Sequence, residues 1–162
     1  PLLALGWYPA ALVAIVANRL LDGLDGALAR RRGLTDAGGF LDIALDFLFY
    51  ALVPFGFALA APTENALAAA WLLFAFIGTG SSFLAFAALA AKHNIDNPGY
   101  AHKSFYYIGG LTEGTETIVL FVLCCLFPAH FTLLAWVFGA LCWLTTTTRI
   151  WSGYVTLKSL NP

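Results

Sequence analysis

Four aspartates lie close together in a part of the chain that is otherwise largely apolar. Asp22 and Asp25 come first, and Asp42 and Asp46 follow after a short stretch of basic residues. A carboxylate inside hydrocarbon is costly unless it pairs with a cation, binds a metal or faces water. Clustered carboxylate oxygens suit hard divalent cations such as Mg²⁺, Mn²⁺ or Ca²⁺. The segment therefore predicts a divalent-cation site.

The spacing of these residues predicts one shared site. At 3.6 residues per turn, one stripe of a first helix carries Asp22, Asp25, Gly26 and Ala29. On a second helix, Asp42 and Asp46 are one turn apart, and Gly38 lies one turn before Asp42. Glycine and alanine have little bulk, so a ligand or another backbone approaches closely there. Two such helices joined by a short loop can surround one or two cations.

The same residues carry a family resemblance. The pattern D-x2-D-G-x2-A-R-x7-G-x3-D-x3-D resembles the signature of the CDP-alcohol phosphotransferases, also called CDP-alcohol phosphatidyltransferases. Its fixed positions are filled by Asp22, Asp25, Gly26, Ala29, Arg30, Gly38, Asp42 and Asp46. The resemblance implies an integral-membrane enzyme of phospholipid biosynthesis. Such enzymes move a phosphatidyl or phosphoalcohol group from a CDP-linked donor to an alcohol acceptor and release CMP.

The resemblance also implies roles for individual residues. The four aspartates would hold Mg²⁺ or Mn²⁺, as two ions, and Asp46 would accept the proton of the acceptor hydroxyl. The CMP part of the donor, expected to be CDP-diacylglycerol, would lie over Gly26, Ala29 and Arg30. The guanidinium of Arg30 suits a diphosphate, and the alternative for this residue is an anchor at the membrane surface. A homodimer and six membrane helices are further expectations from the family.

Three other residues are candidate substrate contacts. Thr35 either lies near the nucleotide or caps the second helix, and the sequence favours neither. Lys103 is a candidate for binding an anionic acceptor or a lipid phosphate, and solvation at the surface is the alternative. Arg149 is expected to bind an anionic acceptor or to pair with Glu113 or Glu116, an i, i+3 pair on the fourth helix.

The composition excludes an ordinary soluble domain. Hydrophobic residues make up 60% of the 162 residues and charged residues only 10%. The chain therefore reads as an all-α polytopic membrane protein, a single transmembrane catalytic domain over residues 1–162. Five complete transmembrane helices are expected at about residues 9–30, 38–61, 66–91, 104–127 and 131–157. Residues 1–6 read as the end of an N-terminally truncated first helix.

Lysine and arginine predict the orientation. Basic residues occur in the loops at 31–37 and 92–103 and at the C-terminal end, whereas the loops at 61–65 and 128–130 carry no lysine or arginine. The positive-inside rule places the basic side in the cytoplasm, which in a bacterium means the cytoplasmic (inner) membrane. The aspartates then lie on the order of 12 Å or less from that side, at 1.5 Å per residue, so the active site is expected to face the cytoplasm. The sequence has no basic patch with interleaved aromatic residues, so it gives no indication that the protein binds nucleic acid.

Three alternatives to catalysis remain at this stage. The first is a structural ion-pair cluster of the aspartates with Arg19, Arg30 and Arg149. In either case Asn18, one turn before Asp22, is expected to orient a carboxylate rather than to bind substrate. An ion-coupled transporter would also place carboxylates within the membrane, although along a path rather than in one layer. A non-catalytic family member acting as a scaffold is the third, and the complete motif argues against it.

Overall fold

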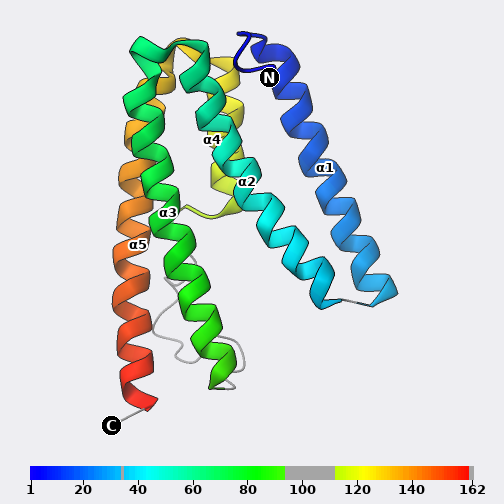
Figure 1. Ribbon diagram of the computed structural model, residues 1–162, viewed down its shortest axis with the longest axis vertical. Coiled ribbons are helices and arrows are strands. Elements are labelled where there is room, and N and C mark those ends of the chain that lie inside the picture. Colours follow the sequence, from blue (N-terminus) through cyan, green and yellow to red (C-terminus); the bar gives the residue numbers. More distant parts are fainter. Residues whose placement is uncertain (34, 94–111, 161–162) are drawn as a thin grey trace.

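The described residues of the chain form five α-helices. A computed structural model describes residues 1–33, 35–93 and 112–160 (Figure 1). The helices are α1 (Tyr8–Arg32), α2 (Asp36–Ala60), α3 (Pro62–Lys92), α4 (Gly114–Leu126) and α5 (Phe131–Leu160), and a 3₁₀ turn, η1 (Pro128–His130), joins α4 to α5. The described residues contain no strand. The all-α prediction is therefore confirmed.

The helix boundaries follow local chemistry. Proline stands in the first turn of α1 and of α3, where its missing N–H costs nothing. Gly33 ends α1 with φ at +100°, a conformation that glycine adopts most readily. The side chain of Thr35 caps α2 by accepting a hydrogen bond from the Gly38 N–H, with 3.2 Å between the heavy atoms. The predicted N-cap of the second helix is thus confirmed.

Length and composition make this a polytopic helical membrane protein. Among the described residues, α2, α3 and the segment Pro128–Ser159 are long and apolar enough to cross a membrane. At 1.5 Å per residue, the 25 residues of α2 span about 37 Å, more than the roughly 30 Å of hydrocarbon. The 25-residue α1 has the length but carries too many charged residues, and α4 is a shorter apolar helix. Leucine and phenylalanine side chains are exposed on many faces, as expected for surfaces that meet lipid.

The turns gather at two opposite ends of the bundle. The connection between α1 and α2 lies at the same end as the last turn of α3 and the C-terminus (Figure 1). The α2–α3 turn and η1 lie at the other end. This alternation is the one that the basic residues predict. Residues 1–6, expected to be the tail of a helix, form a turn in which the Leu5 N–H donates to the Pro1 carbonyl.

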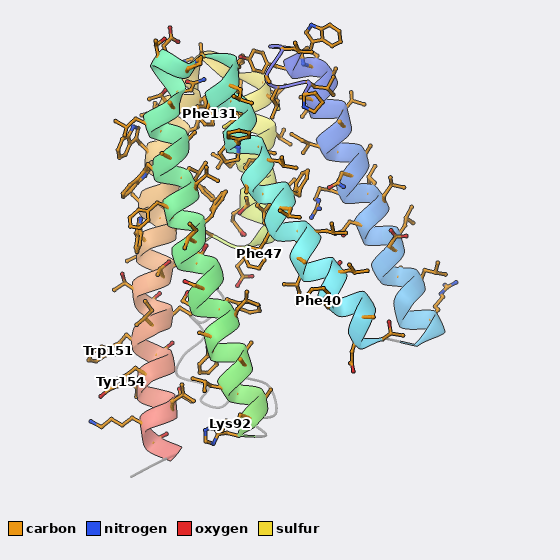
Figure 2. The ribbon with its side chains drawn as sticks, viewed as in Figure 1. Phe40, Phe47, Lys92, Phe131, Trp151 and Tyr154 are labelled. Atoms are coloured by element: carbon orange, nitrogen blue, oxygen red, sulfur yellow. The ribbon has the colours of Figure 1, made fainter. Side chains whose placement is uncertain are left out.

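Aromatic stacking closes the end of the bundle opposite the α1–α2 connection. The rings of Phe57 and Phe131 stack with centroids 4.4 Å apart, and Tyr8 also stacks on Phe57, at 5.5 Å. Small residues allow α3 to approach its neighbours: Gly80 lies against the ring of Phe47, and Gly139 lies against Trp71. Figure 2 shows Phe47 between the helices, with Trp151 and Tyr154 projecting outward from α5.

The fourth helix differs from the prediction where it begins. In the described part it begins at Gly114, and residues 104–111 lie outside the described residues. Glu113 is extended (φ −99°, ψ −170°) and forms a reciprocal capping box with Glu116. The two glutamates are therefore not partners on the face of a continuing helix. Each satisfies a backbone N–H at the start of α4, and this fixes the helix start.

Candidate active site

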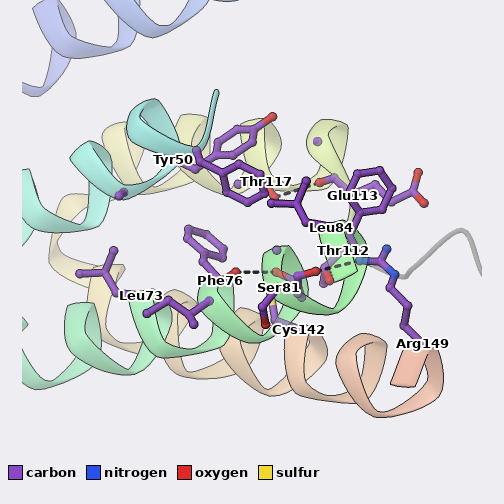
Figure 3. A pocket seen from close by; sticks show the side chains of 17 residues that line it. Tyr50, Leu73, Phe76, Ser81, Leu84, Thr112, Glu113, Thr117, Cys142 and Arg149 are labelled. Atoms are coloured by element: carbon purple, nitrogen blue, oxygen red, sulfur yellow. Dashed lines mark hydrogen bonds between the residues drawn. The ribbon is translucent and has the colours of Figure 1, made fainter. Parts of the chain in front are cut away.

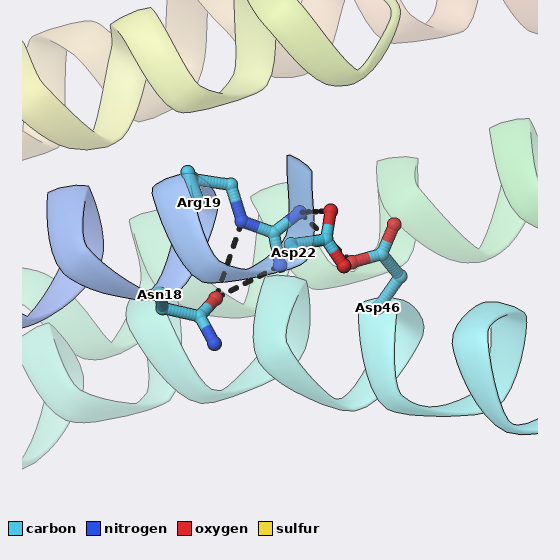
Figure 4. Close-up of polar contacts among 4 residues, drawn as sticks. All are labelled: Asn18, Arg19, Asp22 and Asp46. Carbon is cyan, nitrogen blue, oxygen red and sulfur yellow. Dashed lines mark hydrogen bonds and ion pairs between the residues drawn. The ribbon is translucent and has the colours of Figure 1, made fainter. Parts of the chain in front are cut away.

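Arg19 joins two of the predicted aspartates, which lie on different helices. Its Nη1 atom is 2.9 Å from Oδ1 of Asp46 on α2 and 3.5 Å from Oδ2 of Asp22, one turn further along α1 (Figure 4). The two carboxylates thus converge on a single cationic nitrogen. Among the described residues, these two contacts are the ion pairs present.

The guanidinium of Arg19 is held on its other sides as well. Its carbon lies 4.5 Å from the ring centre of Phe49 and 5.8 Å from that of Tyr50, both within the range of a cation–π contact. Its Nε and Nη2 atoms both donate to Oδ1 of Asn18, at 3.2 and 2.8 Å. Asn18 was expected to orient a carboxylate. That expectation is wrong in this arrangement, because the guanidinium lies between the amide and both acids.

The other two aspartates are not part of this cluster. Asp25 and Asp42 are exposed, and no three His, Cys, Asp or Glu side chains in residues 1–33, 35–93 and 112–160 lie close enough to hold a metal ion together. The structure therefore brings together Asp22 and Asp46 but does not assemble all four acids. Two carboxylates that converge on one cation do fit a divalent ion chemically, because their oxygens are hard donors.

The residues predicted to bind the nucleotide lie at the end of α1 and at the start of α2. Gly26, Ala29 and Arg30 belong to the last turns of α1, and the side chains of Ala29 and Arg30 are outside the described part of the structure. Thr35 is one residue before α2. Its capping bond accounts for its presence, so its contact with a nucleotide stays a prediction. Lys103 lies outside the described residues.

A large cavity lies between α2, α3, α4 and α5. Its volume is about 800 Å³, and Arg149 and Glu113 stand at one end of it (Figure 3). Arg149 donates from Nη1 to the carbonyl of Thr79, at 3.1 Å, and its guanidinium lies over the ring of Phe83. The predicted pairing of Arg149 with Glu113 or Glu116 does not form in the described residues, since Glu116 instead accepts from the Glu113 N–H.

The cavity adjoins the aspartate pair through Tyr50. Its ring lines the cavity and also lies near the guanidinium of Arg19. Away from Arg149 the lining is apolar, with Leu73 and Phe76 at the opposite end (Figure 3). Sequence reasoning missed Tyr50 as a residue of this region. The available signal was its position four residues after Asp46, on the same helix face.

Fold and site together define a helical membrane protein with two acids from different helices paired beside a mainly apolar cavity. The family described as CDP-alcohol phosphatidyltransferase matches residues 2–151, a range that includes every position of the motif. The chain belongs to this family. The family resemblance drawn from the aspartate pattern is therefore confirmed.

A curated relative of the chain is a membrane protein of Escherichia coli (strain K12). The chain is 84% identical to the inner membrane protein YnjF over 161 residues, which cover 99% of this chain and 78% of that protein. The printed name of the relative states where it resides and gives no reaction. No solved structure matches the chain significantly.

Proposed function

We propose that this protein transfers a phosphatidyl or phosphoalcohol group from a CDP-linked donor, expected to be CDP-diacylglycerol, to an alcohol, releasing CMP. Family membership supports the reaction class. The single observation that carries the proposal to this chain is the convergence of Asp22 and Asp46, from two helices, on one cationic position. A cation at that position would lie beside the diphosphate of a donor whose nucleotide rests on the last turns of α1.

The proposed cofactor is Mg²⁺ or Mn²⁺, as two ions held by Asp22, Asp25, Asp42 and Asp46. When bound, such ions neutralise charge on the diphosphate and on the leaving CMP. The donor set supports this proposal, because all four ligands are carboxylates and such cations prefer oxygen. The structure leaves Asp25 and Asp42 exposed and so accessible to a ligand.

The remaining roles belong to residues around the acids. Asp46 is the proposed general base that takes the proton from the acceptor hydroxyl. Its side chain is 31% exposed and lies next to the wall of the cavity formed by Tyr50. Gly26 and Ala29 leave room for the cytidine, and Arg30 is proposed to bind the diphosphate in a bidentate manner.

The cavity is the proposed compartment for the acceptor. Arg149 would bind an anionic group of the acceptor at the polar end, since a guanidinium has five N–H donors and, among the described residues, the Thr79 carbonyl accepts from one of them. Lys103, outside the described residues, is proposed to assist there. The apolar wall around Leu73 and Phe76 suits the hydrocarbon part of a membrane-borne substrate.

The proposed setting is the inner membrane, with residues 1–162 as one transmembrane catalytic domain working as a homodimer. The name of the relative supports the membrane. The last turns of α1, α3 and α5, which carry Arg31, Lys92 and Lys158, lie at one end of the bundle, and this supports a site that faces the cytoplasm (Figure 1). An ion-coupled transporter is less well supported. Four acids lie in the halves of α1 and α2 near their connection, rather than along a path across the membrane.

The experiment that tests this function is CMP release by purified protein. The protein in detergent with CDP-diacylglycerol and a panel of alcohols should release CMP with at least one of them when Mg²⁺ or Mn²⁺ is present. EDTA should abolish the release, and added Mg²⁺ should restore it. Release that persists undiminished in EDTA would contradict the metal site. No release with any alcohol would contradict the reaction.

A further inference from the structure

Arg19 occupies the position at which the carboxylates of Asp22 and Asp46 converge. We propose that Arg19 is an internal counter-cation of this pair and that it sets the affinity of the aspartate site for divalent cations by competing for the same oxygens. This inference rests on the proposed function, because it concerns the metal that the function requires. Arg19 is not a position of the family motif.

The surroundings of Arg19 distinguish it from an ordinary surface arginine. Its side chain is only 18% exposed, and one nitrogen contacts acids from two helices. The plane of the guanidinium lies over Phe49, and Asn18 accepts from two of its nitrogens. All three nitrogens of the guanidinium therefore contact a neighbour, and an aromatic ring packs against the group. A long flexible side chain in solvent would not be held in this way.

The charges of these groups explain why Arg19 and a metal ion would compete for the two carboxylates. Two carboxylates that face one another repel, and a cation between them removes the repulsion. Arg19 supplies one positive charge, whereas a divalent ion supplies two at the same place. An oxygen that accepts from Nη1 of Arg19 has fewer lone pairs for a metal, and two cations at this spacing repel each other. A metal ion must therefore displace the guanidinium or bind more weakly beside it.

The position of Arg19 also predicts a second effect. Helix α1 packs against α4, whereas α2 packs against α3. The contact from Arg19 to Asp46 and the stacking on Phe49 therefore tie α1 to α2 at the depth of the acids. Arg19 is thus a positioning residue: it keeps the two acids facing each other at a defined separation while it lowers their affinity for metal.

The test is a direct measurement of Mn²⁺ binding by electron paramagnetic resonance, with the full chain in detergent and no substrate. Arg19→Gln should bind Mn²⁺ at least about fivefold more tightly than the wild type, at the lower end of typical couplings between sites. Arg19→Lys keeps the charge, so its affinity should stay closer to that of the wild type. Arg31→Gln removes an exposed arginine from the same helix and should leave the affinity unchanged.

Thermal unfolding gives a second readout. Without divalent cation, Arg19→Gln should unfold at a lower temperature than the wild type, because the acids then repel. Saturating Mg²⁺ should raise its unfolding temperature more than that of the wild type. These results together would support the proposal even if a variant is less stable.

Two outcomes would overturn the inference in different ways. Equal or weaker Mn²⁺ binding by Arg19→Gln, with binding abolished by Asp46→Asn, would refute the competition and leave the proposed metal site intact. Failure of both the wild type and Arg19→Gln to bind Mn²⁺ would refute the competition and the metal-dependent function together.

Discussion

Arg19 on α1 and Asp46 on α2 form an ion pair of 2.9 Å at the level of the motif aspartates. The pair is partly buried, since the side chain of Arg19 is 18% exposed and that of Asp46 is 31% exposed. Such pairs contribute about 1 kcal/mol or less to folding. The main consequence of the contact is therefore that it holds a positive charge beside the acids of the site, rather than that it stabilises the fold.

This small energy makes Asp46→Asn an informative variant. We expect it to fold and to lower the rate of CMP release by at least about 100-fold, the size of effect typical for loss of a general base. The rate and the unfolding temperature should both be measured. Asp36→Asn is the control, because Asp36 is exposed in the first turn of α2 and lies outside the motif. Activity of Asp46→Asn near that of the control would remove Asp46 from the site.

A matched pair of glycines tests the packing of α5. A Cβ at Gly139 would collide with the indole of Trp71, whose Nε1 donates to the carbonyl of Trp136, whereas a Cβ at Gly39 on α2 meets nothing within 4 Å. Gly139→Ala should therefore destabilise the protein by about 1–3 kcal/mol, as overpacking does. Gly39→Ala should be neutral or stabilising by up to about 1 kcal/mol. Unfolding temperatures in one detergent would compare them, and an equal effect of both would contradict the described contact of α3 with α5.

Much of the fold could be predicted from the sequence. Long apolar runs broken by proline and polar residues place four helices within a few residues of their observed bounds, and Thr35 is a recognisable cap. The start of α4 was not predicted, because a capping box between Glu113 and Glu116 looks the same in sequence as an i, i+3 pair inside a helix. Both as a capping box and as a pair inside a helix, the two glutamates are three residues apart in the sequence.

The candidate site was predicted only in part, for a related physical reason. Helical periodicity shows that Asp22 and Asp25 share a stripe of α1, but not how closely that stripe approaches α2. The structure shows that Arg19 lies between the two helices and binds Asp22 and Asp46. That position depends on the rings of Phe49 and Tyr50, whose packing against another helix has no signal in a single sequence.

The orientation in the membrane predicts which positions a water-soluble reagent reaches. In a background without cysteine, Thr63→Cys at the start of α3 should react with an impermeant thiol reagent in intact cells. Asp36→Cys, at the opposite end of the bundle, should react only after the membrane is opened. Both positions are exposed, so accessibility within the protein is matched. Labelling of Asp36→Cys in sealed cells would reverse the orientation and the cytoplasmic opening of the site.

Arg149 tests the assignment of the cavity to the acceptor. Its Nη1 donates to the Thr79 carbonyl, and Arg149 lines the polar end of the cavity, where an anionic group of the acceptor is proposed to bind (Figure 3). Lysine retains the charge but has no planar fork for a bidentate contact. Arg149→Lys should therefore raise the Michaelis constant for an anionic acceptor by about tenfold, the effect of roughly 1.4 kcal/mol, and leave that for the CDP-linked donor unchanged.

The control for this variant is Arg31→Lys, which changes an exposed arginine far from the cavity and should alter neither constant. A purely structural Arg149 would behave differently. Loss of its bond to Thr79 and of its contact with Phe83 would lower the unfolding temperature and change both Michaelis constants together. An unchanged acceptor constant in Arg149→Lys, with normal folding, would exclude direct binding of the acceptor by Arg149, because the anionic group would then have its cationic partner elsewhere.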